Sequence, residues 1–81
     1  MTDAEKATFS RACELAEKIS KETEFTAAVE YAPGWSWKAE ARWFKFAGSK
    51  CVKCSNVYGF ENIVPYLEVI YQFAPRKAAG A

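Results

Sequence analysis

Cys51 and Cys54 have the spacing of a zinc half-site or of a redox pair. A structural zinc site needs four ligands, whereas the chain has no histidine and one further cysteine, Cys13. The motif also falls in a predicted strand, where residues three apart point to opposite faces. We therefore expect no metal site and no redox pair: the thiols are free, Cys13 and Cys54 are buried, and Cys51 lies on the outer sheet face.

Acid–base and phosphate chemistry lack their usual residues. No histidine is present to act as a general base at neutral pH, and most carboxylates alternate with lysines along one helix instead of lining an apolar pocket. The four glycines are isolated and form no phosphate-binding loop. Glu40 between Lys38 and Arg42 has the pattern of cross-strand charge pairing. We expect no catalytic residue, no cofactor and no enzymatic activity.

The first predicted element of secondary structure is a long helix. Thr2 and Glu5 have the spacing of a capping box, so this helix should begin at about Asp3 and run for about five turns. Its apolar residues recur at steps of three and four and give it one buried face. From Glu24 the apolar period changes to two, which predicts strands.

Three strands are predicted before a second helix. The first runs to Tyr31, and a turn at 32–34 leads to a second over 35–43, where the slip at Trp43-Phe44 suggests a β-bulge. A turn at 48–49 precedes a third strand over 50–56. After Gly59, an apolar helix runs to Ala74 with Pro65 in its first turn, and Pro75 ends it.

The predicted order defines the fold class. It is an α+β domain with the order helix, three antiparallel strands, helix (αβββα), and both helices cover the sheet face that bears Phe25, Val29, Trp37 and Trp43. With 81 residues, 51% of them apolar or aromatic, we expect one domain over 1–75 and a flexible tail over 76–81. A polar N-terminus, no apolar run of about 20 residues and unpaired cysteines indicate a cytoplasmic protein without membrane contact.

Charge divides the chain unevenly although the net charge is +1. Residues 31–81 hold seven bases against three acids, and several of these bases fall on the predicted strands and turns among aromatic residues. This basic sheet face would suit single-stranded nucleic acid, and we keep it as the alternative function. Its residues are Lys38, Arg42, Lys45, Lys50, Lys53, Phe44 and Phe46. Double-stranded-RNA-binding domains share the element order, but the lysines they use at the second helix are replaced here by 59–62, which holds no base.

The second helix is more apolar than one sheet contact requires. Beside its inward row, Tyr66, Val69 and Phe73 form a second row, with Tyr58 near its start. A monomer would leave this row in water, and exposed apolar area of this kind usually marks a partner site. We expect these four residues to bind a protein partner or a second copy of the chain, with the aromatic rings as anchors.

A small, aromatic-rich domain without an active site is similar to the anti-defence proteins of bacteriophages and mobile elements, including anti-CRISPR proteins. The resemblance rests on size and architecture. It implies an inhibitor or adaptor that occupies a surface on a host protein or nucleoprotein complex, without cofactor or catalysis.

Overall fold

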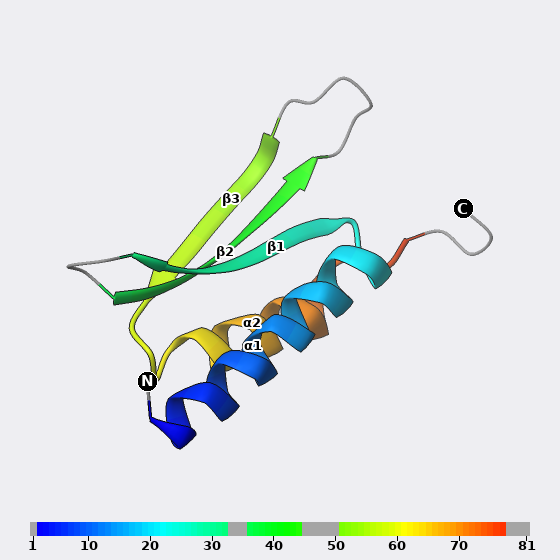
Figure 1. The fold of residues 1–81 in the computed structure, drawn as a ribbon. Coiled ribbons are helices and arrows are strands. Elements are labelled where there is room, and N and C mark those ends of the chain that lie inside the picture. Colours follow the sequence, from blue (N-terminus) through cyan, green and yellow to red (C-terminus); the bar gives the residue numbers. More distant parts are fainter. Residues whose placement is uncertain (1, 33–35, 45–50, 78–81) are drawn as a thin grey trace.

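The protein folds as a three-stranded antiparallel sheet with two helices on one of its faces (Figure 1). The structure, a computed structural model, describes residues 2–32, 36–44 and 51–77, without the side chains at 31, 32, 36, 44 and 51–53. The strands lie in the order β1-β2-β3. The predicted αβββα fold is confirmed. The elements are α1 (Asp3–Glu22), β1 (Phe25–Ala32), β2 (Ser36–Phe44), β3 (Cys51–Tyr58) and α2 (Ile63–Phe73).

Helix α1 begins where its cap predicts. The Glu5 amide donates to Thr2 Oγ1 at 3.1 Å, and the Thr2 amide donates to Glu5 Oε1 at 3.2 Å. Both bonds satisfy amides that have no acceptor inside the helix. One face of the helix is buried, with Ala12, Leu15, Ala16 and Ile19 in the core.

Thr23 joins the end of α1 to β1 and is fully buried. Its hydroxyl donates to the Ile19 carbonyl at 2.6 Å and accepts from the Phe25 amide at 3.1 Å. One side chain therefore ends the helix and directs the chain into the sheet. This is how a buried polar group avoids the cost of desolvation.

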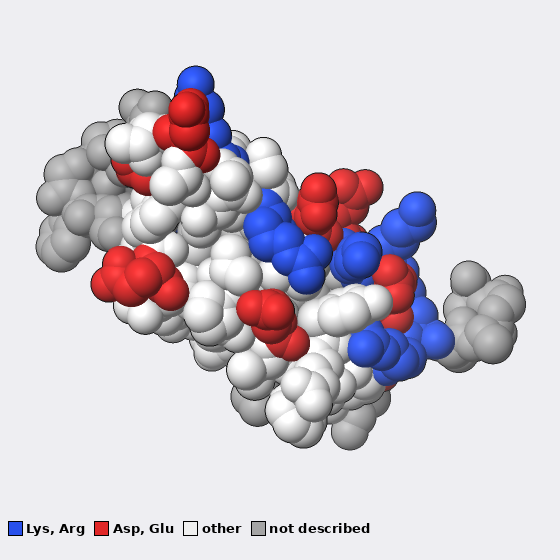
Figure 2. Space-filling view, turned by 90° about the horizontal axis from the view of Figure 1, so that it is seen from below, with Lys and Arg blue, Asp and Glu red and all other residues white. Residues whose placement is uncertain are grey.

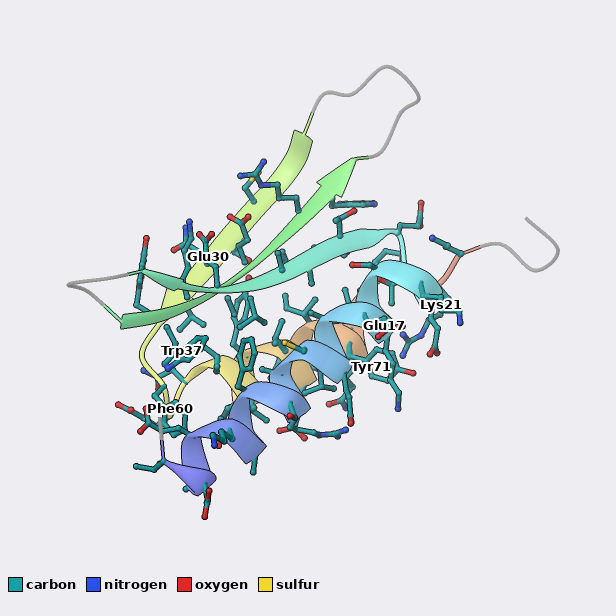
Figure 3. The ribbon with its side chains drawn as sticks, viewed as in Figure 1. Glu17, Lys21, Glu30, Trp37, Phe60 and Tyr71 are labelled. Carbon is teal, nitrogen blue, oxygen red and sulfur yellow. The ribbon has the colours of Figure 1, made fainter. Side chains whose placement is uncertain are left out.

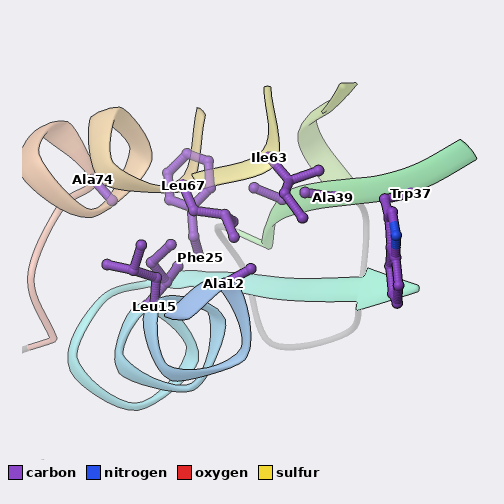
Figure 4. Close-up of a cluster of buried hydrophobic side chains, with 10 residues drawn as sticks. Ala12, Leu15, Phe25, Trp37, Ala39, Ile63, Leu67 and Ala74 are labelled. Atoms are coloured by element: carbon purple, nitrogen blue, oxygen red, sulfur yellow. The ribbon is translucent and has the colours of Figure 1, made fainter. Parts of the chain in front are cut away.

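The inner face of β2 shapes the core. Trp37 and Trp43 stand at its two ends, and the fully buried Ala39 and Ala41 lie between them. Two small residues leave room for α2, whose Ile63 and Leu67 are also fully buried; Figure 4 shows these side chains in the same cluster as Ala39. Both helices lie on the face that the alternation predicted.

The register between β2 and β3 shifts at the predicted irregularity. Trp43 pairs with Lys53, but Phe44 pairs with Cys51, so Val52 is an extra residue on β3. The extra residue of the bulge lies on β3 and not on β2. An insertion of this kind interrupts the strict alternation of side chains along the strand.

Between β3 and α2 the chain turns at Gly59, whose φ of 107° is accessible to glycine at little cost. A Cβ there would come within 2.8 Å of the side-chain amide nitrogen of Asn62. Both the positive φ and this close contact therefore favour glycine at this turn. Helix α2 then starts at Ile63, which places Pro65 in its first turn as predicted.

The chain after α2 forms backbone hydrogen bonds with the end of α1 through residue 77. The Glu24 amide donates to the Pro75 carbonyl at 2.8 Å, and the Lys77 amide donates to the Glu22 carbonyl at 3.1 Å. Arg76 pairs with Thr23 as an isolated β-bridge. Residues 78–81 of the predicted flexible tail lie outside the described residues.

Candidate protein-binding groove

A groove of about 280 Å³ opens between the C-terminal half of α2 and the sheet. The sheet contributes Phe25 and Trp43, and α2 contributes Val69, Ile70 and Phe73. The segment after α2 adds Ala74 and Pro75 at the end of the groove. We call this site the Trp43 groove; the side chains that line it are apolar.

The groove exists because the helices and the sheet separate at this end. Strand twist carries β2 and β3 away from the helix layer, and Figure 1 shows their upper ends extending beyond both helices. Helix α2 ends at Phe73, followed by Pro75, which cannot continue it. Trp43 and Phe25 stack with ring centroids 5.8 Å apart and planes at 9°, and they form the floor that the helices leave partly uncovered.

Phe73 and Val69 are large apolar side chains of the groove that are exposed to solvent. Phe73 is 75% exposed and Val69 is 54% exposed. They are one helical turn apart, so they stand on the same side of α2. Helix α2 carries one charged residue, Glu68, and this leaves a largely apolar outer surface. Figure 2, which views the helix layer, shows a broad uncharged area interrupted by isolated acidic side chains.

Tyr66 and Tyr58, the other two predicted partner-binding residues, do not join this surface. Tyr66 packs against the core, and its hydroxyl lies 2.6 Å from Ser55 Oγ of β3 in a partly buried hydrogen bond. Tyr58 is 49% exposed but pairs in register with Lys38 on the opposite sheet face. The predicted row of Tyr66, Val69 and Phe73 therefore does not form one exposed surface: Val69 and Phe73 come together, whereas Tyr66 is partly buried and Tyr58 lies on the other sheet face.

Sequence reasoning missed the residues that complete the groove. Alternation places Phe25 and Trp43 in the core beneath the helices, and helical periodicity places Ile70 in the inward row of α2. Trp43 is the groove residue that the sequence could have indicated, because the alternation of apolar and polar residues in β2 is interrupted directly after it. A side chain next to such an irregularity stands where the sheet leaves its regular path, and there a helix cannot cover it evenly.

The described part of the basic sheet face is neutralised by carboxylates. Lys38 Nζ lies 3.6 Å from both Glu30 and Glu40, and Arg42 lies 3.5 Å from Glu40. Lys38 Nζ also stands 6.0 Å from the Tyr58 ring centroid. Figure 3 shows Glu30 on the side of the sheet away from the helices. Two bases and two acids thus face solvent together, which leaves this part of the face without net charge.

The other side chains of that predicted face lie outside the described part of the chain. Lys45, Phe46 and Lys50 are outside the described residues, as are the side chains of Phe44 and Lys53. The register adds one fact about the backbone: Lys53 pairs with Trp43, whose ring packs on the helix side, and not with Arg42.

Cys54 corrects two predictions, because it is exposed and disulfide-bonded. Its bonded partner lies outside the described side chains, since Cys13 is free. Cys54 pairs with Arg42, which places it on the outer sheet face. Cys13 is half-buried in α1, and burial raises the pKa of its thiol. The predicted outer-face position of Cys51 lies outside the described side chains.

The described ranges contain no candidate metal site. Within them, no three cysteine, aspartate or glutamate side chains come together as metal ligands. A second hollow, of about 470 Å³, lies between the starts of the two helices, but Arg11 and Glu61 border it. Arg11 there pairs with Glu14 at 3.7 Å. Across residues 2–32, 36–44 and 51–77, no helix has the length and apolarity to cross a membrane.

Comparison with known proteins finds no matching protein family, no matching curated protein and no matching solved structure.

Proposed function

We propose that this chain is a non-enzymatic protein-binding module that uses the Trp43 groove and the exposed side chains of Val69 and Phe73. The observation that carries the proposal is the exposure of Phe73, 75%, on the edge of an apolar groove. A large aromatic side chain in water forgoes the free energy of its own burial, which a partner surface would recover.

The composition of the groove supports a protein partner over a small ligand. Aromatic side chains dominate the energetics of protein interfaces, and Phe25, Trp43 and Phe73 stand together here. Among the described residues, no charged side chain lines the groove to orient a small polar ligand. A flat apolar surface with an adjacent cavity suits the insertion of side chains from another protein.

Within this class, we infer an inhibitor or adaptor of the anti-defence type, which acts by covering a surface on a host protein or nucleoprotein complex. Such a protein needs a stable small domain and one binding surface, and it needs no catalytic group. A cytoplasmic location belongs to the same inference, although the disulfide at Cys54 does not support a reducing compartment.

The test compares two exposed aromatic residues on opposite sides of the molecule. Phe73→Ala should abolish capture of partner proteins from the native host, whereas Tyr58→Ala on the outer sheet face should leave capture unchanged. Both side chains are exposed, so both variants should keep their fold, which circular dichroism and thermal unfolding would check. Equal capture by the two variants would remove the groove from the proposal.

The basic sheet face remains the competing explanation, and salt separates it from the groove. Binding to phosphates weakens steeply as salt rises, whereas burial of apolar surface does not. We expect weak, non-specific binding of DNA and RNA at physiological salt, because Lys38 and Arg42 are paired with Glu40. Tight binding that Lys38→Glu with Arg42→Glu destroys would favour the nucleic-acid function instead.

A further inference from the structure

We propose that Cys51 and Cys54 form a reversible disulfide on the outer face of β3, which exchanges with a dithiol reductant of the thioredoxin class. The inference is independent of the Trp43 groove and of any protein bound there. It differs from the expectation of no redox pair, because that expectation assumed regular alternation along the strand.

The count of cysteines identifies the two bonded residues. Cys54 is disulfide-bonded, whereas Cys13 is free. The chain contains three cysteines, so Cys51 is the one that remains as a partner within the chain. The two residues are three positions apart, a spacing that a regular strand does not allow a disulfide to bridge.

The register between β2 and β3 makes this spacing bridgeable. Cys54 pairs with Arg42 and Cys51 pairs with Phe44, so their partners are two residues apart on β2. Residues two apart share a face of the strand and are about 6.7 Å from each other, whereas three residues of regular strand span about 10 Å. A disulfide joins Cα atoms up to about 6.8 Å apart. The extra residue on β3 therefore places both cysteine positions on the outer face at a separation that a disulfide can span.

A disulfide at this place adds little to the stability of the fold. The stabilisation that it gives by restricting the unfolded chain grows with the length of the loop that it closes, and the loop over 51–54 is among the shortest possible. Strand β3 already pairs with β2 along its length, and the helices lie on the opposite face of the sheet (Figure 1). The domain does not need this bond in order to fold, which leaves the bond free to be broken and re-formed.

Cys54 is accessible to a reductant, and a base stands opposite it. Cys54 is exposed, and β3 is an edge strand of the sheet. Arg42 is its direct partner on β2, whereas Glu40, which Arg42 contacts at 3.5 Å, pairs with Asn56 further along β3. A guanidinium beside a cysteine favours the thiolate, which is the leaving group when a disulfide is reduced and the nucleophile when it re-forms. Exposure and an adjacent base are features of labile disulfides.

The exchange transfers two electrons and two protons. A thiolate of the reductant attacks one sulfur of the disulfide, forms a mixed disulfide and expels the other sulfur as a thiolate, which takes up a proton. The second thiol of the reductant loses its proton, attacks the mixed disulfide and releases the reduced chain. The products are two thiols on the chain and one disulfide on the reductant. Oxidised glutathione reverses the change and is itself reduced to two molecules of glutathione.

The experiment follows reduction of the full, oxidised chain by thioredoxin, with thioredoxin reductase and NADPH. The chain should consume one NADPH for its one disulfide, and mass spectrometry after alkylation in denaturant should show modification at Cys51 and Cys54 in addition to Cys13. Trypsin cuts after Lys53, between the two cysteines, so the disulfide should join two peptides before reduction and none after it. Cys51→Ser with Cys54→Ser should consume no NADPH, whereas Cys13→Ser is the matched control and should behave as the unmodified chain.

Two variants of the outer face test the role of the base. Arg42→Gln should slow alkylation of reduced Cys54 by iodoacetamide about three- to fivefold, the effect expected for one charge a few ångström away in water. Lys38→Gln removes a base of the same face that pairs with Tyr58 instead, and the rate should stay unchanged. The same tryptic peptides report the alkylation of each cysteine separately. An equal rate in both variants would overturn the role of Arg42.

Three results would overturn the redox site itself. They are a tryptic map without the link after oxidation by glutathione, a linked chain that thioredoxin does not reduce, and loss of the circular dichroism spectrum on reduction. The last would make the disulfide a structural bond. Reduction and re-oxidation with the spectrum kept would support the proposal, whatever protein the groove binds.

Discussion

Each tryptophan on the inner face of β2 contacts another aromatic ring, and the surroundings of the two pairs differ. Phe9 and Trp37 lie 4.7 Å apart between ring centroids, and Trp37 is 7% exposed. Phe25 and Trp43 lie 5.8 Å apart, and Trp43 is half-buried at the floor of the groove. The two tryptophans share one strand and one face, so their residue type and alternation do not distinguish them.

The difference arises from what covers each pair. Trp37 lies under the first half of α1 and near Phe60, just before α2; Figure 3 shows both side chains on the helix side of the sheet. Trp43 lies where α2 ends and the strands continue past it. A tryptophan on the inner face of a sheet is therefore a core residue or part of a site according to where the covering helix stops.

The largest expected loss of stability comes from removing the ring of Trp37, the buried tryptophan. Trp37→Ala should lower the free energy of unfolding by about 3–5 kcal/mol, because it leaves a cavity in the core. Trp43→Ala should cost less, roughly 1–3 kcal/mol, because part of its ring already contacts water. Urea unfolding of both variants measures the two values. Equal losses would mean that the two ends of the sheet are equally packed.

A smaller loss of stability is expected at Thr23, which connects α1 to β1 and positions Phe25 at the Trp43 groove. Thr23→Val keeps the shape of the side chain but removes its hydroxyl. The Phe25 amide then loses its side-chain acceptor, whereas the Ile19 carbonyl still accepts the Thr23 amide at 3.0 Å. An unsatisfied buried group costs about 1–3 kcal/mol, so unfolding should become easier by that amount. Urea unfolding again provides the measurement, and Thr26→Val on the exposed face of β1 is the matched control. A loss of the same size in Thr26→Val would contradict the role of the buried hydroxyl.

Local sequence patterns were sufficient to predict the helices and strands of this fold. The Thr2 and Glu5 spacing located the start of α1, and the change from period four to period two located β1, because caps and alternation depend on neighbours in sequence. The slip after Trp43 located the register shift. Which strand holds the extra residue depends on pairing between β2 and β3, which no single stretch of sequence contains.

The candidate site depended on contacts between distant parts of the chain. Tyr66 does not lie on the expected surface, because its hydroxyl forms a hydrogen bond of 2.6 Å with Ser55 of β3. Helical periodicity does not reveal a partner on another element. Tyr58 is separated from α2 by the sheet itself. The prediction of a buried Cys54 is wrong because Cys54 pairs with Arg42 on the outer sheet face, and this pairing between β2 and β3 is not contained in either strand's sequence. Val69 and Phe73 could be predicted, since their exposure follows from the face of one helix.

The smallest effect concerns the polar contact that joins α2 to the end of α1, on the outside of the helix layer. Tyr71 Oη donates to Glu22 Oε1 at 2.7 Å, and the Arg76 guanidinium lies 4.3 Å from the ring centroid. The hydrogen bond to Glu22 raises the pKa of Tyr71 above its usual value of 10, and burial and the negative charge of Glu22 act in the same direction; Arg76 opposes them.

The sign of the pH dependence follows from that direction. The folded chain holds the Tyr71 proton more tightly than the unfolded chain does, so the stabilising contribution is complete below pH 10 and is lost as pH rises through the folded pKa. The measurement is the difference in free energy of unfolding between the unmodified chain and Tyr71→Phe, taken from pH 8 upward. All other residues are identical in the two proteins, so their contributions cancel in this difference. We expect a small difference that is constant to about pH 10 and shrinks above it, because the phenylalanine ring of the variant cannot ionise. A difference that stays constant through pH 11 would show that the contact with Glu22 does not hold the Tyr71 proton in the folded chain.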